Sequence, residues 1–189
     1  MKLSKDYQYI VLCEDAQMKA FILRFLMEHS INSHRIRFRN YPKGEGSGEA
    51  FVKTNYPLEM GFLRRNAFRK ILLITCIDAD WYSFKERMEQ LDWALDKMGI
   101  EARDDKDLAM VWIPKREIET WIHYLRGEDV DEEMSFRHDG NLVSCRNEAK
   151  MMVKICQDPN AIEFDRTLPS LSDAVTEYGR ACQLQYLKT

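Results

Sequence analysis

Hydrophobic residues along this chain fall into short continuous runs, separated by longer segments in which they recur every three or four positions. Three runs, at residues 7–13, 70–77 and 108–113, are typical of strands buried on both faces of a parallel sheet. A fourth segment, 34–39, alternates arginine with apolar residues, which is typical of a strand with one face in solvent. The pattern therefore predicts four strands.

Between and after these runs the apolar residues recur at helical spacing. The expected helices cover residues 17–29, 57–66, 83–98, 116–125, 148–157 and 172–184. Through residue 125, strand and helix alternate, which predicts one parallel sheet with right-handed crossovers and helices on both faces. The expected fold class is therefore α/β: a four-stranded, parallel, Rossmann-like sheet with a C-terminal helical elaboration.

Length and composition are those of a globular protein, with 45% hydrophobic and 31% charged residues among 189. We expect an α/β core over residues 1–127, and an acidic loop with C-terminal helices packed on that core over 128–189. No run approaches the roughly 18 uninterrupted apolar residues of a membrane helix, and the N-terminus lacks the apolar segment of a signal peptide. These features predict a cytoplasmic protein without a membrane partner. None of the five cysteines forms a CxxC pair, and reduced thiols are expected.

Acidic residues stand directly after two of the expected strands: Glu14 after the first, Asp78 and Asp80 after the third. The carboxyl ends of parallel strands meet at one edge of a sheet, and residues i and i+2 of an extended segment point the same way. We therefore expect the three carboxylates to converge. Like charges repel unless a cation or proton lies between them, and carboxylate oxygens suit Mg²⁺ or Mn²⁺. Glu119, near the start of an expected helix, is a further candidate ligand.

A simpler interpretation of Asp78 and Asp80 is that they begin a turn and cap the following helix, since aspartate favours both positions. Glu119 has a similar alternative, because glutamate in a first helical turn interacts favourably with the helix dipole.

Positive charge is concentrated between residues 34 and 70, where nine Lys or Arg stand against three acids, a local net charge of +6. Such a block beside an acidic metal site suits a phosphodiester substrate, although a solvated face of mixed charge has the same pattern. A glycine-rich loop lies within the block, and it lacks the Gly-Lys-Ser/Thr ending of a Walker A motif. The candidate phosphate-binding residues are Arg35, Arg37, Lys43, Gly44, Gly46 and Gly48.

The order of strands and acids over residues 7–125 resembles the Toprim domain, which topoisomerases, bacterial primases and several nucleases share. That family places a glutamate after its first strand and a DxD pair after its third, the places that Glu14 and Asp78-Ala79-Asp80 take here. The chain is most similar to small stand-alone bacterial Toprim-like proteins. Those carry a glycine loop and a P-x-x-E-x-E-x-W segment, here Pro114 to Trp121.

The resemblance implies a Mg²⁺-dependent nuclease, or a nuclease subunit, with Glu14, Asp78 and Asp80 as catalytic and metal-binding residues. It also implies nucleic acid as the substrate and an ATPase as a possible partner, because some relatives sit beside ATPases in phage-defence loci. Asp15 stands where the family often has glycine, and Trp81 begins the segment where topoisomerases often have a third acid. The first departure affects how closely a phosphate can approach the turn after Glu14. The second favours a nuclease over a topoisomerase or primase.

Two other functions stay open. A module that keeps this fold without catalysis would act as a binding or scaffold subunit. A signalling receiver domain also has an acidic pair after its first strand and an aspartate after its third, as Glu14-Asp15 and Asp78 would supply. Such a domain needs a lysine after a fifth strand, and the sequence offers no evident candidate.

Overall fold

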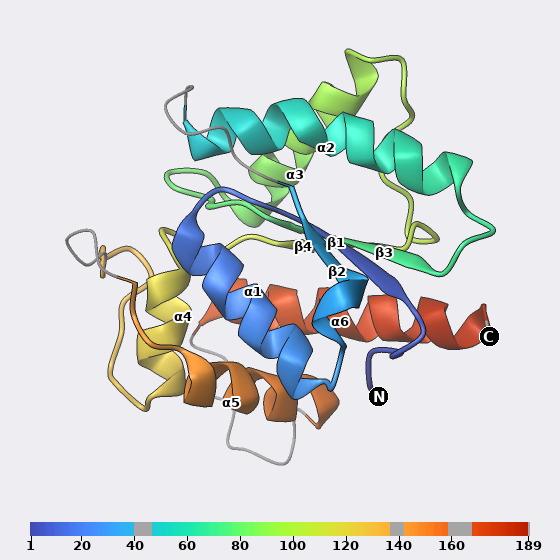
Figure 1. The fold of residues 1–189 in the computed structure, drawn as a ribbon. Helices are drawn as coiled ribbons and strands as arrows, with labels where there is room; N and C mark the ends of the chain where they lie inside the picture. Colours follow the sequence, from blue (N-terminus) through green and yellow to red (C-terminus); the bar gives the residue numbers. More distant parts are fainter. Residues whose placement is uncertain (40–46, 137–141, 159–167, 189) are drawn as a thin grey trace.

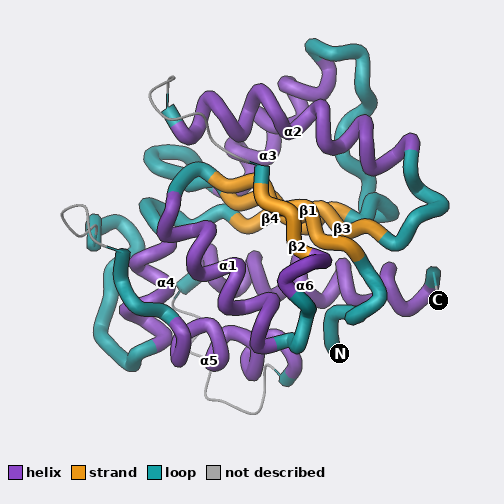
Figure 2. Tube along the Cα trace, in the orientation of Figure 1, coloured by secondary structure: helices purple, strands orange, loops and turns teal. Residues whose placement is uncertain are grey.

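A four-stranded parallel sheet organises the protein. The computed structural model describes residues 1–39, 47–136, 142–158 and 168–188. The strands are β1 (Gln8–Cys13), β2 (Ile36–Phe38), β3 (Ile71–Cys76) and β4 (Ala109–Trp112), in the spatial order β2-β1-β3-β4. The predicted α/β class with a parallel sheet is confirmed (Figure 2). The described residues contain no fifth strand of the kind that a receiver domain requires.

Helices cover both faces of the sheet, as expected (Figure 1). One face carries α2 and α3, and the other carries α1, α4, α5 and α6. The helices are α1 (Ala16–Glu28), α2 (Gly48–Arg65), α3 (Phe84–Asp96), α4 (Ile118–Leu125), α5 (Arg146–Gln157) and α6 (Pro169–Leu187), with a short 3-10 helix η1 (Ser33–Arg35) before β2.

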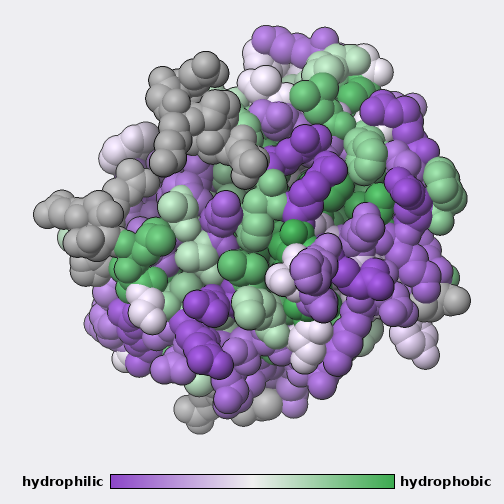
Figure 3. Space-filling view, viewed as in Figure 1, coloured by the Kyte–Doolittle hydropathy of each residue, from purple (hydrophilic) through white to green (hydrophobic). Residues whose placement is uncertain are grey.

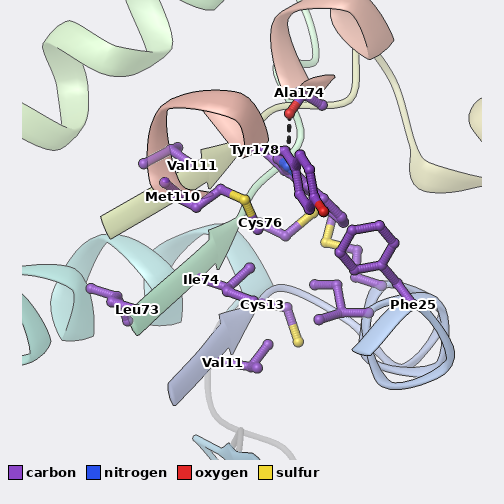
Figure 4. Packing of buried hydrophobic residues seen from close by; sticks show 14 of the residues in the cluster. Val11, Cys13, Phe25, Leu73, Ile74, Cys76, Met110, Val111, Ala174 and Tyr178 are labelled. Carbon is purple, nitrogen blue, oxygen red and sulfur yellow. Dashed lines mark hydrogen bonds between the residues drawn. The ribbon is translucent and has the colours of Figure 1, made fainter. Parts of the chain in front are cut away.

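The hydrophobic core lies against β1 and β3, the two central strands. Every residue of β3 is buried, as is every residue of β1 after Gln8, which accounts for their continuous apolar runs. On the side of α1 and α6, the rings of Phe25 and Tyr178 meet edge to face with centroids 5.9 Å apart (Figure 4). Residues from both the N-terminal and the C-terminal parts thus belong to one buried cluster.

On the face shown in Figure 3, hydrophilic side chains cover most of the surface over α5, and hydrophobic ones form scattered patches. Among the described residues, no helix is both long enough and apolar enough to cross a membrane.

The second strand is shorter than the expected 34–39. Asn32 accepts a hydrogen bond from the backbone N–H of His34 (3.0 Å) and caps η1, so the chain turns before it extends at Ile36. The alternating pattern was nonetheless informative, because β2 is an edge strand whose Arg37 faces solvent.

The second helix begins nine residues before the expected start at Pro57. Ser47 caps it by accepting a hydrogen bond from Ala50 N–H (3.2 Å), and Pro57 lies inside the helix. Proline disfavours helix interiors because it lacks a donor and crowds the preceding turn. Here the turns before Pro57 are anchored by the buried side chains of Val52 and Tyr56, whose packing outweighs that cost.

The C-terminal helix α6 covers the outer edge of β4. The Val111 N–H, which has no neighbouring strand, donates to Glu177 Oε2 (3.1 Å), and the Ala109 carbonyl accepts from Arg103 (3.0 Å) and Arg180. Hydrogen bonds from Arg180 and Arg103 outweigh the effect of burial and hold the pKa of Glu177 below its ordinary value. An exposed strand edge is an aggregation hazard, and these side chains close it.

We predict that Glu177→Gln destabilises the protein by about 3 kcal/mol, because it leaves two largely buried guanidinium groups without their counter-charge. The amide oxygen keeps the bond to Val111, so the loss reports the ion pairs alone. Urea unfolding measures it. Glu89→Gln removes an exposed carboxylate 3.8 Å from Lys85 and is the matched control, expected within about 0.5 kcal/mol of wild type. Equal effects of the two substitutions would contradict the prediction.

Candidate functional site

The carboxyl ends of β1 and β3 lie side by side, because the register pairs Cys13 with Cys76. Glu14 and the segment after β3 therefore leave the sheet at the same level. The Glu14 carboxylate accepts a hydrogen bond from the backbone N–H of Asp78, with an N–Oε2 distance of 2.5 Å. The expected meeting of the first and third strand ends is confirmed.

Backbone geometry explains why Glu14 is bound there. Beyond β3, the N–H groups of Ile77 and Ala79 donate to the carbonyls of Trp112 (3.1 Å) and Pro114 (2.7 Å), on the β4 side. The N–H of Asp78, between them, points to the opposite side, where β1 has already ended. A buried amide without a partner is costly, and the Glu14 carboxylate takes the place of the missing strand carbonyl.

The surroundings of Glu14 favour its protonated form. Burial is the largest cause and raises its pKa from 4.5 to about 7; the Asp78 N–H opposes this shift. The charges of Asp80 and Glu49 raise the pKa further, and that of Arg87 lowers it. Near neutral pH, Glu14 is therefore divided between acid and carboxylate, a state suited to proton transfer.

Asp80 differs from expectation. Its φ of 54° places it in the left-handed region, so the chain turns at Asp80, and the expectation that Asp78 and Asp80 project alike from an extended segment is wrong. Asp78 is buried, whereas the Asp80 side chain is 47% exposed. Neither residue caps α3: Ser83 does, in a capping box with Glu86.

Arg87 is the central residue that the sequence analysis missed. Its side chain is fully buried. It donates to the Glu49 carboxylate, to Asp80 Oδ2 (3.3 Å), to the Ala79 carbonyl (3.2 Å) and to Gln90 (2.8 Å). The signal was present in the sequence, because Arg87 precedes two buried leucines of α3 at four-residue steps and thus stands on its apolar stripe.

Gly48, the first residue of α2, contacts Glu14 directly. A Cβ at position 48 would lie 2.5 Å from the Glu14 carbonyl oxygen and 2.9 Å from the Glu14 Cβ. In Figure 1 the starts of α1 and α2 lie at the same side of the molecule, on the left. The glycine thus permits α2 to begin against Glu14. Lys43, Gly44 and Gly46, the other candidates of this loop, lie outside the described residues.

The two candidate arginines, Arg35 and Arg37, do not lie with Glu14, Asp78 and Asp80. Arg35 donates to the carbonyl of Asp6 (2.9 Å), which precedes β1 and so lies at the opposite edge of the sheet. Arg37 lies beside the buried Glu59, 3.9 Å from its carboxylate, on the flank of α2. These partners are typical of residues with a structural role.

Glu119 is buried in the first turn of α4, the helix that follows β4. Its position beyond a strand end keeps it a candidate ligand. Its neighbour Glu117 is also buried and accepts hydrogen bonds from Ser135 Oγ (3.0 Å) and from the N–H of Phe136, which tie the segment after α4 to the start of that helix.

Within the described ranges, no group of three or more His, Cys, Asp or Glu side chains is arranged as a metal site. The donor chemistry nevertheless suits a hard cation, because Asp78 and Asp80 offer carboxylate oxygens, and Mg²⁺ commonly keeps several waters with only one or two protein carboxylates.

No family model, curated protein or solved structure matches this chain. The resemblance to Toprim domains is therefore carried by the motif residues alone.

We predict that Glu14→Gln stabilises the chelator-treated protein at about pH 8 and not at about pH 5. The folded-state pKa of Glu14 is raised. The contribution of Glu14 to the free energy of unfolding is therefore fully present below the ordinary glutamate pKa of 4.5, and it is lost as the pH rises towards 7. Glutamine keeps the acceptor for Asp78 and cannot ionise. The gain at pH 8 is at most about 3 kcal/mol. Thermal unfolding at the two pH values measures it, and a gain that does not depend on pH would contradict the prediction.

We further predict that Gly48→Ala destabilises the protein by about 1–3 kcal/mol, because the added methyl group forces α2 away from Glu14. Gly179→Ala is the matched control: a Cβ there meets no atom within 4 Å, and alanine should stabilise α6 by up to about 1 kcal/mol. Opposite signs in urea unfolding are expected. A neutral Gly48→Ala would show that the close contact is absent.

Proposed function

We propose that the protein hydrolyses phosphodiester bonds of nucleic acid with Mg²⁺ or Mn²⁺ as cofactor. The supporting observation is the geometry of the carboxyl edge, where Glu14 is held against the backbone of Asp78 and feels the charge of Asp80. The Toprim-like order of Glu14, Asp78 and Asp80 along the sequence is a second, separate support for the same chemistry.

Asp78 and Asp80 would hold the ion, with Glu119 as a candidate for an outer position. When bound, such an ion polarises a phosphate oxygen and lowers the pKa of a coordinated water. Asp80 is half-exposed and paired with Arg87, and Asp78 is buried, so a site formed by both would require the Asp80 side chain to turn towards Asp78.

Glu14 would act as general base and acid. A group with a pKa of about 7 can accept a proton from water and return it to the leaving oxygen at neutral pH. Gly48 and the Asp78 N–H fix the position of Glu14, and Arg87 fixes Asp80. Holding these groups in position before the reaction lowers the entropy loss on reaching the transition state.

One observation favours the second candidate, a non-catalytic binding or scaffold subunit. The buried guanidinium of Arg87 already pairs with Asp80 and Glu49, so part of the negative charge is balanced by the protein itself. In that case the acids would stabilise the sheet edge. An ATPase partner and a role in phage defence are proposals that rest on the Toprim resemblance.

We predict metal-dependent cleavage of plasmid DNA or of DNA and RNA oligonucleotides by the wild type, reduced by about 100-fold or more in Asp78→Asn, because removing a metal ligand costs at least as much as removing one of its supporting partners. Millimolar Mn²⁺ should also raise the melting temperature of the wild type but not that of the variant.

Asp96→Asn is the control, since Asp96 is an exposed aspartate at the far end of α3. Equal cleavage by wild type and Asp78→Asn would reject this site. Absence of both cleavage and Mn²⁺ stabilisation would favour the scaffold candidate.

A further inference from the structure

An exposed tryptophan adjoins the acidic edge. Trp81 directly follows Asp80, and 83% of its surface is exposed, unusual for the largest apolar side chain. The guanidinium carbon of Arg116 lies 3.6 Å from its ring centroid, a cation–π contact on one face of the indole. With that face covered and the residue still this exposed, much of the ring surface stays open to solvent.

The protein holds this pair in place. The Ala79 N–H bonds to the Pro114 carbonyl (2.7 Å), which sets the segments carrying Trp81 and Arg116 next to each other. The Arg116 side chain is only 14% exposed, and its Nη2 lies 3.5 Å from Glu133. Arg116 is therefore a fixed support beneath the indole.

The adjoining segment is held in the same way. Lys115 Nζ donates to the carbonyl of Tyr82 (3.2 Å) and lies 3.3 Å from Glu133. Tyr82 is exposed beside Trp81. One carboxylate, that of Glu133, thus holds both cations beside the two exposed aromatic residues.

We infer that the Trp81–Arg116 pair stacks an unpaired base of single-stranded nucleic acid at the acidic edge. A flat aromatic surface backed by a fixed cation is the kind of platform on which bases stack irrespective of sequence. Paired bases in a duplex are already stacked on their neighbours and cannot use it. The inference rests on the proposed function and names the form of its substrate.

Charge around the platform indicates how binding depends on salt. Lys115 and Arg116 share Glu133, and Asp80 lies alongside, so phosphate attraction is weak here. Stacking then carries most of the affinity. The dependence of the dissociation constant on salt should be shallow, unlike that of proteins that neutralise many phosphates.

The test is fluorescence anisotropy with a labelled oligothymidylate of about 12 nucleotides, within the usual range of single-strand sites. A chelator is present, so that nothing is cleaved. Trp81→Leu should weaken binding roughly 5- to 100-fold, the loss typical of one stacked base, and Trp81→Phe should keep most of the affinity. The melting temperature should be unchanged, because Trp81 is exposed.

Trp93→Leu is the matched control. Trp93 is also an exposed tryptophan with a cation over its ring, Lys97 Nζ at 3.4 Å, but it lies in the last turn of α3. Its replacement should leave the affinity unchanged. Equal affinity of wild type and Trp81→Leu, equal affinity for a duplex of the same length, or no binding to any oligonucleotide would each overturn the inference.

The two proposals fail separately. Binding that depends on Trp81 in chelator, without cleavage in Mg²⁺, would overturn the proposed hydrolysis alone. Cleavage in Mg²⁺ by the wild type, together with equal affinity of wild type and Trp81→Leu in chelator, would overturn the stacking platform alone.

Discussion

The hydrogen bond between the Glu14 carboxylate and the Asp78 N–H is the contact on which the carboxyl edge depends. It lies just beyond the paired ends of β1 and β3 and prevents an unpaired buried amide at Asp78. The same bond holds a carboxylate in a buried position beside Asp80, where its pKa rises to about 7. The Glu14 side chain thus satisfies a buried backbone amide and also has a pKa suited to proton transfer. Gly48 leaves the space in which Glu14 lies.

The two candidate functions differ in how the negative charge around this contact is balanced. Arg87 is a buried cation that pairs with Asp80 and Glu49, while Glu14 binds the backbone N–H of Asp78. If a dication binds as well, Arg87 is a positioning residue that orients Asp80 and limits repulsion among the acids. If none binds, the same ion pairs make the edge self-sufficient, and the fold serves to present Trp81 and its neighbours to a partner.

The sequence predicted the strands and their acidic ends because two-sided burial leaves a strong local trace, as in β1 and β3. The expected start of the second helix at Pro57 is wrong, because proline favours the first turn of a helix. The four-residue spacing of Val52 and Tyr56 in the sequence indicates the longer helix. Other features depend on contacts distant in sequence: the partner that Glu177 provides for β4, the positive φ of Asp80, and the closeness of Gly48 to Glu14. Local patterns cannot specify these, since each arises only when separate elements pack.

A crystal soaked in millimolar Mn²⁺ and measured for anomalous scattering addresses the central claim most directly. The account predicts a peak at the carboxyl edge, roughly 2.0–2.4 Å from carboxylate oxygens of Asp78 and Asp80, typical of coordination by hard oxygen ligands. Glu14 should still be bound to the Asp78 N–H or should have turned towards the ion. An edge without any such peak, with Arg87 unchanged between Asp80 and Glu49, would contradict the metal-dependent account.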